Sequence, residues 1–267
     1  MRRHESESIY LLREAFHHFP KMAMLWSVGK DSTVLLWLAR KAFLGRVPFP
    51  LIHIDTSYKI PEMLDWRDRI AREWKLDLIV ARNEPVLAAS QTFPTGSTTR
   101  VDCCTKLKTD ALQQVVDAHH FEALIVGVRR DEDATRAKER YVSPRGVDMQ
   151  WNVTEQPPEF WDQFRTHVPA GTHMRIHPLL HWTELDIWEY IRDEAIPVTP
   201  LYFDRGDGTR YRSLGCAPCT ATITSTARTV DDIIDELRTT RVAERSLRAQ
   251  DQESEDAFER LRRDGYM

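Results

Sequence analysis

The 267-residue sequence lacks the features of membrane, secreted and repetitive proteins. It has no stretch of 18 apolar residues, and it has no apolar run of signal-peptide length near its first residue. We found no internal repeat and no low-complexity segment. The formal net charge is only −4, so charge alone gives no general attraction to nucleic acid or to a membrane. These absences predict a cytoplasmic globular protein without a membrane partner.

Cysteine is also scarce, since the chain has only four such residues. A protein of this kind does not build a disulfide framework from so few cysteines, and metal or redox chemistry is the better interpretation. All four fall into two pairs, Cys103-Cys104 and Cys216-x-x-Cys219. Two C-x-x-C elements are typical of structural zinc, whereas adjacent cysteines can reach two corners of one iron–sulfur cubane. The metal-ligand candidates are therefore Cys103, Cys104, Cys216 and Cys219, and four unliganded thiols remain the alternative.

One polar stretch, residues 26–32, separates an apolar segment of strand length (residues 22–26) from a mostly apolar helix (residues 33–43). A strand, a tight turn and a helix present free backbone N–H groups to a phosphate chain, and Lys30 adds a positive charge. The Walker pattern is excluded because the spacing between its glycines is missing. The candidate ATP and pyrophosphate ligands here are Ser27, Val28, Gly29, Lys30, Asp31 and Ser32, with Lys30 and Asp31 also as candidate catalytic residues. An ordinary strand–helix turn is the alternative.

Further strands are predicted at residues 49–55, 78–80 and 121–128, and helices at 62–74 and 106–119. Alternating strands and helices indicate an α/β fold with a twisted, mainly parallel sheet covered by helices on both faces. Ligands bind at the carboxyl ends of such strands, which adds Asp55, Thr56 and Gly127 to the nucleotide-binding candidates. We expect residues 1–200 to form the nucleotide domain. Residues 201–267 would then form a C-terminal segment with the second cysteine pair and a helical tail.

A basic segment follows the fourth predicted strand, at the edge that carries the loop around Lys30. Its guanidinium groups suit a phosphate or sulfate anion. We therefore expect Arg129, Arg130, Arg136 and Lys138 to bind the acceptor anion, with Arg129 and Arg130 also catalytic. A solvated, charged helix face is the alternative. Residues 143–173 are expected to form an irregular excursion.

These motifs resemble a known superfamily. Residues 27–32 are similar to the PP-loop of ATP pyrophosphatases, with Val28 in place of the usual first glycine. The cysteine pattern resembles the [4Fe-4S] ligation of adenylylsulfate reductases. Most of the chain, including residues 127–140 and the closing Arg262-Arg263-Asp264-Gly265-Tyr266, looks like the small subunit of sulfate adenylyltransferase and the phosphoadenylylsulfate reductases. The resemblance implies an adenine nucleotide α-hydrolase-like fold, with ATP, Mg²⁺ and a [4Fe-4S] cluster as cofactors.

The sequence departs from both relatives. The adenylyltransferase subunit does not carry the paired cysteines, and the reductases carry a nucleophilic cysteine in their tail, whereas none follows Cys219 here. We therefore expect an ATP pyrophosphatase that forms AMP and pyrophosphate to activate an acceptor for iron–sulfur-dependent sulfur transfer, as in DNA phosphorothioation. Its partners would be a cysteine desulfurase or another sulfur donor, and a transient nucleic-acid acceptor. The alternative is a sulfate adenylyltransferase subunit with a GTPase large subunit. A reductase or a non-catalytic scaffold is less favoured.

Overall fold

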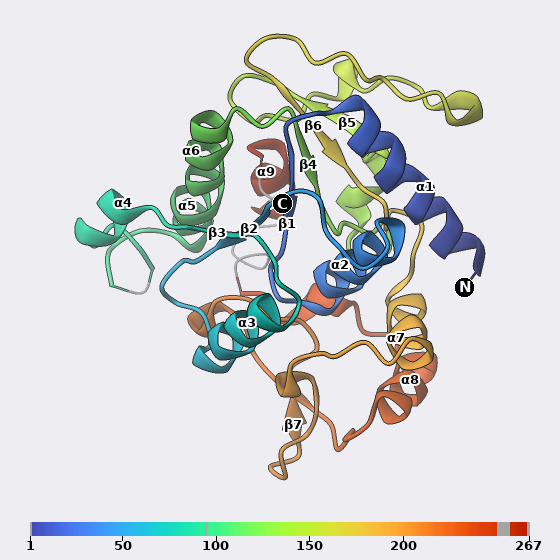
Figure 1. Cartoon of the computed structure of the whole chain (residues 1–267). Helices are drawn as coiled ribbons and strands as arrows, with labels where there is room; N and C mark the ends of the chain where they lie inside the picture. The colour runs from blue at the N-terminus through green and yellow to red at the C-terminus, as the bar shows by residue number, and fades with distance from the viewer. Residues whose placement is uncertain (1, 94, 250–256, 266–267) are drawn as a thin grey trace.

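The computed structural model describes residues 2–93, 95–249 and 257–265. Its centre is a six-stranded sheet in the order β3-β2-β1-β4-β6-β5 (Figure 1). Four of the strand pairs are parallel, and only β5 runs antiparallel to its neighbour β6. The strands are β1 (Met22–Leu25), β2 (Leu51–Ile54), β3 (Leu78–Ala81), β4 (Ala123–Ile125), β5 (Val142–Arg145) and β6 (His173–Ile176).

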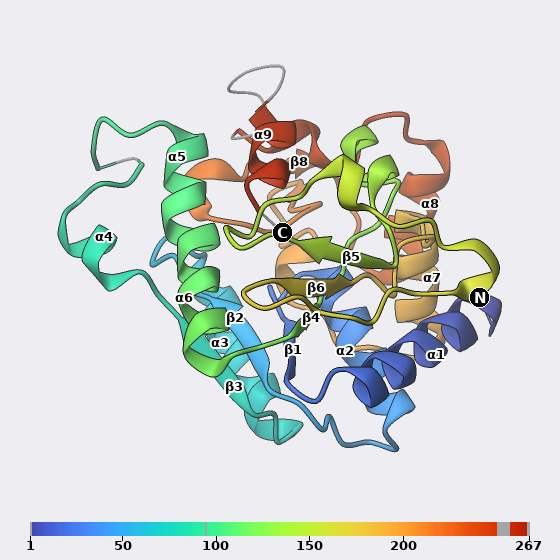
Figure 2. The same ribbon diagram turned by 90° about the horizontal axis from the view of Figure 1, so that it is seen from above.

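Helices cover the sheet on both faces (Figure 1 and Figure 2). They are α1 (Arg2–His18), α2 (Lys30–Ala42), α3 (Pro61–Glu73), α4 (Glu84–Ala88), α5 (Arg100–Cys104), α6 (Asp110–His119), α7 (Glu184–Asp193), α8 (Val230–Thr239) and α9 (Ala257–Arg263). Short 3₁₀ segments include η2 (Ala134–Lys138), η6 (Ala217–Cys219) and η7 (Glu244–Leu247), and a two-stranded ribbon pairs β7 (Thr209–Arg210) with β8 (Ile223–Thr224).

Alternation along β1 explains the two cores. Met24 and Trp26 face one side and pack with apolar residues of α1, α2, α3, α7 and α8. Ala23 and Leu25 face the other side and pack mainly with α6. Side chains of successive strand residues point to opposite faces, so a strand buried on both sides has to be apolar throughout. The predicted α/β architecture, with a mainly parallel and doubly covered sheet, is confirmed.

Three elements differ from the sequence-based prediction. The helix expected at residues 106–119 begins at Arg100 and passes through a π-helical turn, η1 (Thr105–Thr109), before α6. The excursion expected at residues 143–173 opens with β5, an edge strand that tolerates Pro144. The tail is not continuously helical, because Thr240 is extended at the end of α8 and η7 follows. Residues 250–256, Tyr266 and Met267 lie outside the described residues.

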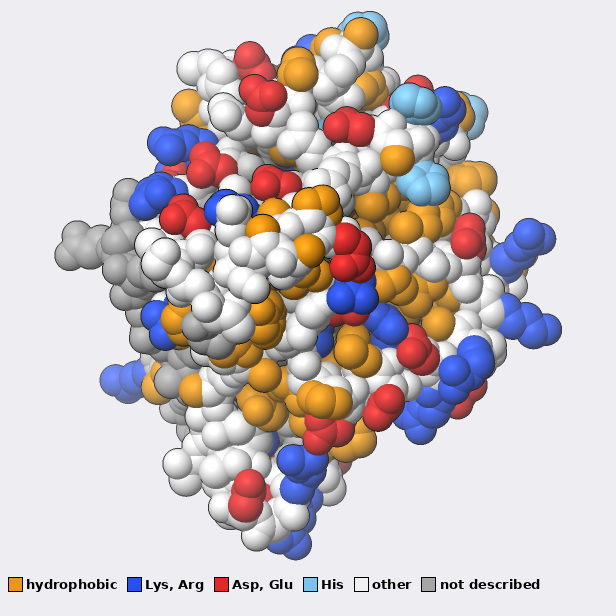
Figure 3. Space-filling view, turned by 90° about the vertical axis from the view of Figure 1, so that its left-hand side faces the viewer, with side chains coloured by type: hydrophobic (Ala, Val, Ile, Leu, Met, Phe, Trp, Pro, Cys, Tyr) orange, Lys and Arg blue, Asp and Glu red, His pale blue; other side chains and the backbone are white. Residues whose placement is uncertain are grey.

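The side of the molecule that carries α4, α5 and α6 shows basic and acidic side chains interspersed with apolar ones, and neither sign gathers there (Figure 3). This surface agrees with the small net charge of the sequence. Within the part of the chain that the structure describes, no helix combines the length and the hydrophobicity needed to cross a membrane.

Candidate functional site

The turn between β1 and α2 has a special backbone. Val28 adopts φ 69°, in the left-handed region that a β-branched residue seldom occupies. Gly29 is the N-cap of α2, without a side-chain cap, and Lys30 is the first helical residue. The first amides of a helix lack carbonyl partners within the helix, so they and the helix dipole favour an anion at this end.

Side chains hold this turn in place. The Ser27 and Ser32 hydroxyl oxygens lie 3.1 Å apart, and the Ser32 hydroxyl donates to the Gly29 carbonyl at 3.1 Å. The backbone N–H of Lys30 donates to the phenol oxygen of Tyr202 at 2.7 Å. The C-terminal part of the chain therefore contacts the turn directly.

Gly127, just beyond β4, lies against the first turn of α2. A Cβ atom there would be 3.3 Å from the amide nitrogen of Ser32 and 3.4 Å from its Cα atom. These contacts are tighter than most side chains accept, which explains a glycine at this position. Because β4 pairs with β1 in parallel, the carboxyl ends of both strands open into the same space.

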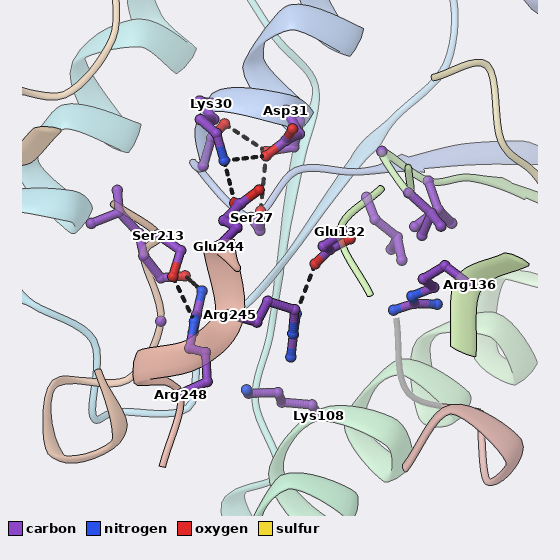
Figure 4. A pocket seen from close by; sticks show the side chains of 18 of the residues that line it. Ser27, Lys30, Asp31, Lys108, Glu132, Arg136, Ser213, Glu244, Arg245 and Arg248 are labelled. Atoms are coloured by element: carbon purple, nitrogen blue, oxygen red, sulfur yellow. Dashed lines mark hydrogen bonds and ion pairs between the residues drawn. The ribbon is translucent and has the colours of Figure 1, made fainter. Parts of the chain in front are cut away.

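That space is a cleft of about 910 Å³ (Figure 4). Its lining combines the turn, the end of β4 and residues from distant parts of the chain. The polar and glycine residues of the lining are Ser27, Gly29, Lys30, Asp31, Ser32, Lys59, Lys108, Gly127, Glu132, Arg136, Tyr202, Ser213, Gly215, Glu244, Arg245 and Arg248. Six of them are lysine or arginine, so the cleft is suited to a polyanion.

Buried ion pairs cross the cleft at the turn. The Lys30 ammonium group donates to Asp31 at 3.1 Å and to Glu244. Arg129, only 1% exposed, donates to Glu244 at 2.5 Å and to Asp131 at 2.8 Å, and it also pairs with Asp31. Burial opposes ionisation of Glu244, but Lys30 and Arg129 outweigh it and hold the pKa of that carboxyl well below its usual range.

The C-terminal segment supplies further charged residues from η7 and its neighbour. Arg245 donates to Glu132 at 2.7 Å, and Arg248 donates to the Ser213 hydroxyl at 2.9 Å (Figure 4). Burial lowers the pKa of Lys59, another cleft residue, to about 8. The sequence analysis missed all of these residues. Lys59 alone had a usable signal, since it follows the carboxyl end of β2.

The predicted acceptor ligands do not all reach the cleft. Arg136 lines it, and Arg129 lies behind it. Arg130 instead contacts His181 and donates to the Glu139 carbonyl at 3.2 Å, in a different cavity. Lys138 is about half exposed and pairs with Glu259 at 2.8 Å. Arg129 and Arg136 therefore lie at the cleft, whereas Arg130 and Lys138 have partners outside it, and the anion-binding role of this segment stays a prediction.

The two residues predicted after β2 also lie outside the cleft lining. The Asp55 carboxylate accepts the backbone N–H of Ser57 at 2.8 Å and so stabilises the following turn. The Thr56 hydroxyl lies 3.1 Å from the Sγ atom of Cys216. Asp55 therefore stabilises the turn after β2, and Thr56 contributes to the lining of the cysteine cavity.

All four cysteines line one small cavity of about 280 Å³. Cys103 and Cys104 come from α5, and Cys216 and Cys219 flank η6, so the fold joins two pairs that are far apart in sequence. All four are free thiols. Among the described residues, no three His, Cys, Asp or Glu side chains lie close enough to bind a single metal ion.

Lys108 lines both the cysteine cavity and the cleft, so the two sites share this side chain. Burial opposes ionisation of Cys216, but Lys108, Lys59 and the Thr56 hydrogen bond together lower its thiol pKa. Burial raises the pKa of Cys219 to about 11, and its cysteine neighbours add to the effect. The pKa values of the two cysteines of this pair are therefore shifted in opposite directions.

Comparisons with known proteins agree with this geometry. The model of the phosphoadenosine phosphosulfate reductase domain matches residues 21–222. Sulfate adenylyltransferase subunit 2 of Rhizobium tropici is 42% identical over 292 residues, which cover 98% of this chain and 91% of that protein. Two solved structures share the fold at low identity. Phosphoadenylyl-sulfate reductase from Candida auris has a TM-score of 0.58 at 20% identity, covering 80% of this chain and 90% of that one. Candida glabrata FMN adenylyltransferase has a TM-score of 0.55 at 17% identity, covering 80% and 61%.

The fold is that of the adenine nucleotide α-hydrolase-like proteins. The chain belongs to the phosphoadenosine phosphosulfate reductase domain family, and it is similar over its full length to sulfate adenylyltransferase small subunits. The predicted family resemblance is confirmed, and so is the prediction of an adenylyl-transferring enzyme.

Proposed function

We propose that the protein is an ATP-dependent adenylyltransferase whose acceptor is sulfate, with adenylylsulfate and pyrophosphate as products. The observation that carries the proposal is the cleft that begins at the anion-binding turn around Lys30 and continues along further cations. Similarity to sulfate adenylyltransferase subunit 2 supports sulfate over the nucleic-acid acceptor that the sequence analysis favoured. Sulfate adenylylation, the alternative in the sequence analysis, is therefore preferred to sulfur transfer onto DNA.

In this proposal the turn holds the leaving pyrophosphate. Backbone N–H groups around Gly29, the hydroxyls of Ser27 and Ser32 and the Lys30 ammonium group stabilise the charge that develops as the bond between the α- and β-phosphates breaks. Preorganised donors of this kind are the main catalytic device in phosphoryl and adenylyl transfer. Mg²⁺ bound with ATP would neutralise further phosphate charge, and the Asp31 carboxylate of the turn is the residue that would hold it.

The acceptor oxyanion would occupy the part of the cleft beyond the turn. Arg136, Lys108, Arg245 and Arg248 line this part and offer several donors to a tetrahedral anion. Planar guanidinium groups can bind two oxygens at once, which orients the acceptor for attack on the α-phosphate. The reaction needs no nucleophile from the protein, because a sulfate oxygen attacks directly and pyrophosphate leaves.

The cysteine quartet supports an iron–sulfur cluster as a resident group. Four thiols around one cavity match the donor set of a [4Fe-4S] cluster, which is held by four cysteine thiolates. Cys103, Cys104, Cys216 and Cys219 would hold it, and Thr56 would donate a hydrogen bond to the Cys216 sulfur. When bound, the cluster would crosslink α5 to the η6 loop and place a redox-active centre beside Lys108.

An iron–sulfur cluster would also suit a second function, sulfur transfer. Sulfur transfer to an adenylylated acceptor, such as DNA phosphorothioation, is favoured by one observation, the position of the cysteine cavity next to the cleft. That function would require a cysteine desulfurase as partner. Sulfate activation would instead involve a GTPase large subunit, consistent with the "subunit 2" in the relative's name.

Isotope exchange between pyrophosphate and ATP tests the proposal. We expect exchange that depends on sulfate and that increases when a GTPase large subunit is added. Exchange that ignores sulfate but requires DNA or a desulfurase would favour the second function. Release of orthophosphate and ADP would contradict both.

A further inference from the structure

The Glu244 carboxylate lies where a phosphate group of ATP would be expected. It bridges the Lys30 ammonium group and the Arg129 guanidinium group, and its side chain is only 7% exposed. These contacts join η7 to the turn across 214 sequence positions. In Figure 4 the Glu244 side chain points from η7 toward Lys30 and Asp31. A carboxylate with two cationic partners has the charge and the donor contacts that a bound phosphate oxygen would have.

The charges at the turn are already balanced in this arrangement. Lys30 and Arg129 have Glu244, Asp31 and Asp131 as ion-pair partners, so no excess positive charge remains there for a polyphosphate. If Glu244 stayed in place, a phosphate group bound at the turn would lie against its ionised carboxylate. Contact between like charges is costly in a buried site. The depressed pKa of Glu244 agrees with a permanently ionised group at neutral pH.

The segment that carries Glu244 has the features of a part that can move. Residues 238–243, which lead into η7, are all exposed. On the other side, Arg245 of η7 donates to Glu132 and lies over the Phe258 ring at 4.1 Å, and Arg248, the residue after η7, donates to Ser213. An exposed connection of this kind lowers the free energy of local opening.

We propose that Glu244 is a tethered anion that occupies the phosphate position of the cleft and has to leave Lys30 and Arg129 before ATP binds. This inference rests on the proposed function, because it takes the turn to be the phosphate site. The apparent affinity for nucleotide is then reduced by the fraction of molecules in which Glu244 has moved away. Nucleotide binding and the position of the C-terminal segment become coupled, and a partner that holds η7 open would raise affinity.

Calorimetry with metal-free pyrophosphate tests this coupling, with EDTA present to remove divalent cations. We expect Glu244→Gln to bind pyrophosphate about tenfold more tightly than the wild-type protein, a difference that corresponds to about 1.4 kcal/mol. The matched control is Glu189→Gln, which removes the same charge from a surface pair with Arg238. It should leave the dissociation constant unchanged within about twofold.

Other results would overturn the inference. Equal affinity of Glu244→Gln and wild type for pyrophosphate would contradict the proposal that Glu244 competes with phosphate. It would leave the assignment of the phosphate site itself unaffected. Weaker binding by the variant would assign Glu244 to holding the ligand. Absence of pyrophosphate binding in every protein would contradict the phosphate site itself, and with it the proposed function.

Hydrogen exchange of the wild-type protein gives a second test that needs no variant. The amides of Arg248 and Ala249 donate to the carbonyls of Arg245 and Cys219 at 2.9 and 3.3 Å. Release of η7 should make both amides exchange faster when pyrophosphate is added. Unchanged or slower exchange would contradict the proposed movement.

Discussion

Glu139 and Arg262 form a fully buried ion pair, with 3.1 Å between the carboxylate and a guanidinium nitrogen. The pair joins the basic segment after β4 to the last helix, α9, across 123 positions. Arg145 donates to the same carboxylate at 3.2 Å, and the Arg262 guanidinium lies 3.9 Å from the ring centre of Trp151. This arrangement anchors α9 to the basic segment and to Trp151 through buried contacts.

We predict that Glu139→Gln lowers the free energy of unfolding by roughly 3–5 kcal/mol, because it leaves buried guanidinium groups without their carboxylate. Urea denaturation measures the change. Arg262→Lys should also destabilise the protein, since an ammonium group cannot reproduce both the pairing and the contact with Trp151. Glu62→Gln is the control, because its pair with Arg205 is about half exposed and should contribute about 1 kcal/mol at most. Equal effects of all three variants would contradict the special role of Glu139.

Lys30→Ala is predicted to slow pyrophosphate release from ATP by roughly 10²-fold, the usual scale for loss of a preorganised charge donor. Exchange assays at saturating ATP measure the change in turnover. Lys138→Ala serves as control, since Lys138 pairs with Glu259 outside the cleft and its loss should leave turnover unchanged. Similar rates for wild type and Lys30→Ala would exclude the turn around Lys30 as the pyrophosphate site.

Arg136 and Arg130 should differ in their response to substitution by lysine. Arg136 is buried and lines the cleft, so Arg136→Lys should raise the KM for the acceptor by about tenfold or more through loss of bidentate contacts. Arg130 lies in another cavity beside His181, so Arg130→Lys should keep wild-type kinetics. Initial rates at varied sulfate measure both. If only Arg130→Lys impaired turnover, the placement of the acceptor site would be wrong.

The sequence was sufficient to predict the sheet and the turn because both depend on local patterns. The apolar run before Ser27 and the apolar helix after Ser32 define a strand–turn–helix unit, whatever the remaining chain does. The start of α7 is a comparable local signal, since Thr183 and Asp186 form a capping box with reciprocal hydrogen bonds. Local patterns of this kind determine secondary structure without reference to distant parts of the chain.

The contribution of the tail could not be predicted for a physical reason. Glu244 and Arg248 reach the cleft only because Thr240 ends α8 in an extended conformation and the chain returns toward the turn. A helical period assigned to this tail gives no sign of such a return. The position of Arg130 in another cavity has a related reason, because charge and proximity to β4 in the sequence do not determine the direction of a side chain after the strand has ended.

The cysteine cavity leads to a prediction about iron. Cys216→Ala and Cys219→Ala should each reduce iron content and visible absorption of anaerobically purified protein, and should lower stability at the same time, because metal binding is coupled to folding. Iron and sulfide analysis together with thermal unfolding measures both effects. Thr56→Val is the milder variant, which removes the hydrogen bond to Cys216 and should keep the iron. Colourless wild-type protein with stoichiometric zinc would contradict the cluster.

Two buried histidines should make the protein less stable in mild acid. Burial lowers the pKa of His177 to about 4 and that of His53 to about 3, below the value of 6.5 expected in the unfolded chain. The unfolded state therefore binds more protons, so the stabilisation is complete above pH 6.5 and is lost as pH falls toward the folded-state values. The free energy of unfolding should fall by up to roughly 1.4 kcal/mol per pH unit for each histidine.

Urea titrations between about pH 7 and about pH 4 measure this slope of the unfolding free energy against pH. His177→Gln should flatten the slope, because glutamine can still donate to the Arg140 carbonyl without titrating. His17→Gln, at an exposed position of α1, should leave the slope unchanged. An equal slope in His177→Gln and wild type would show that other groups cause the acid sensitivity.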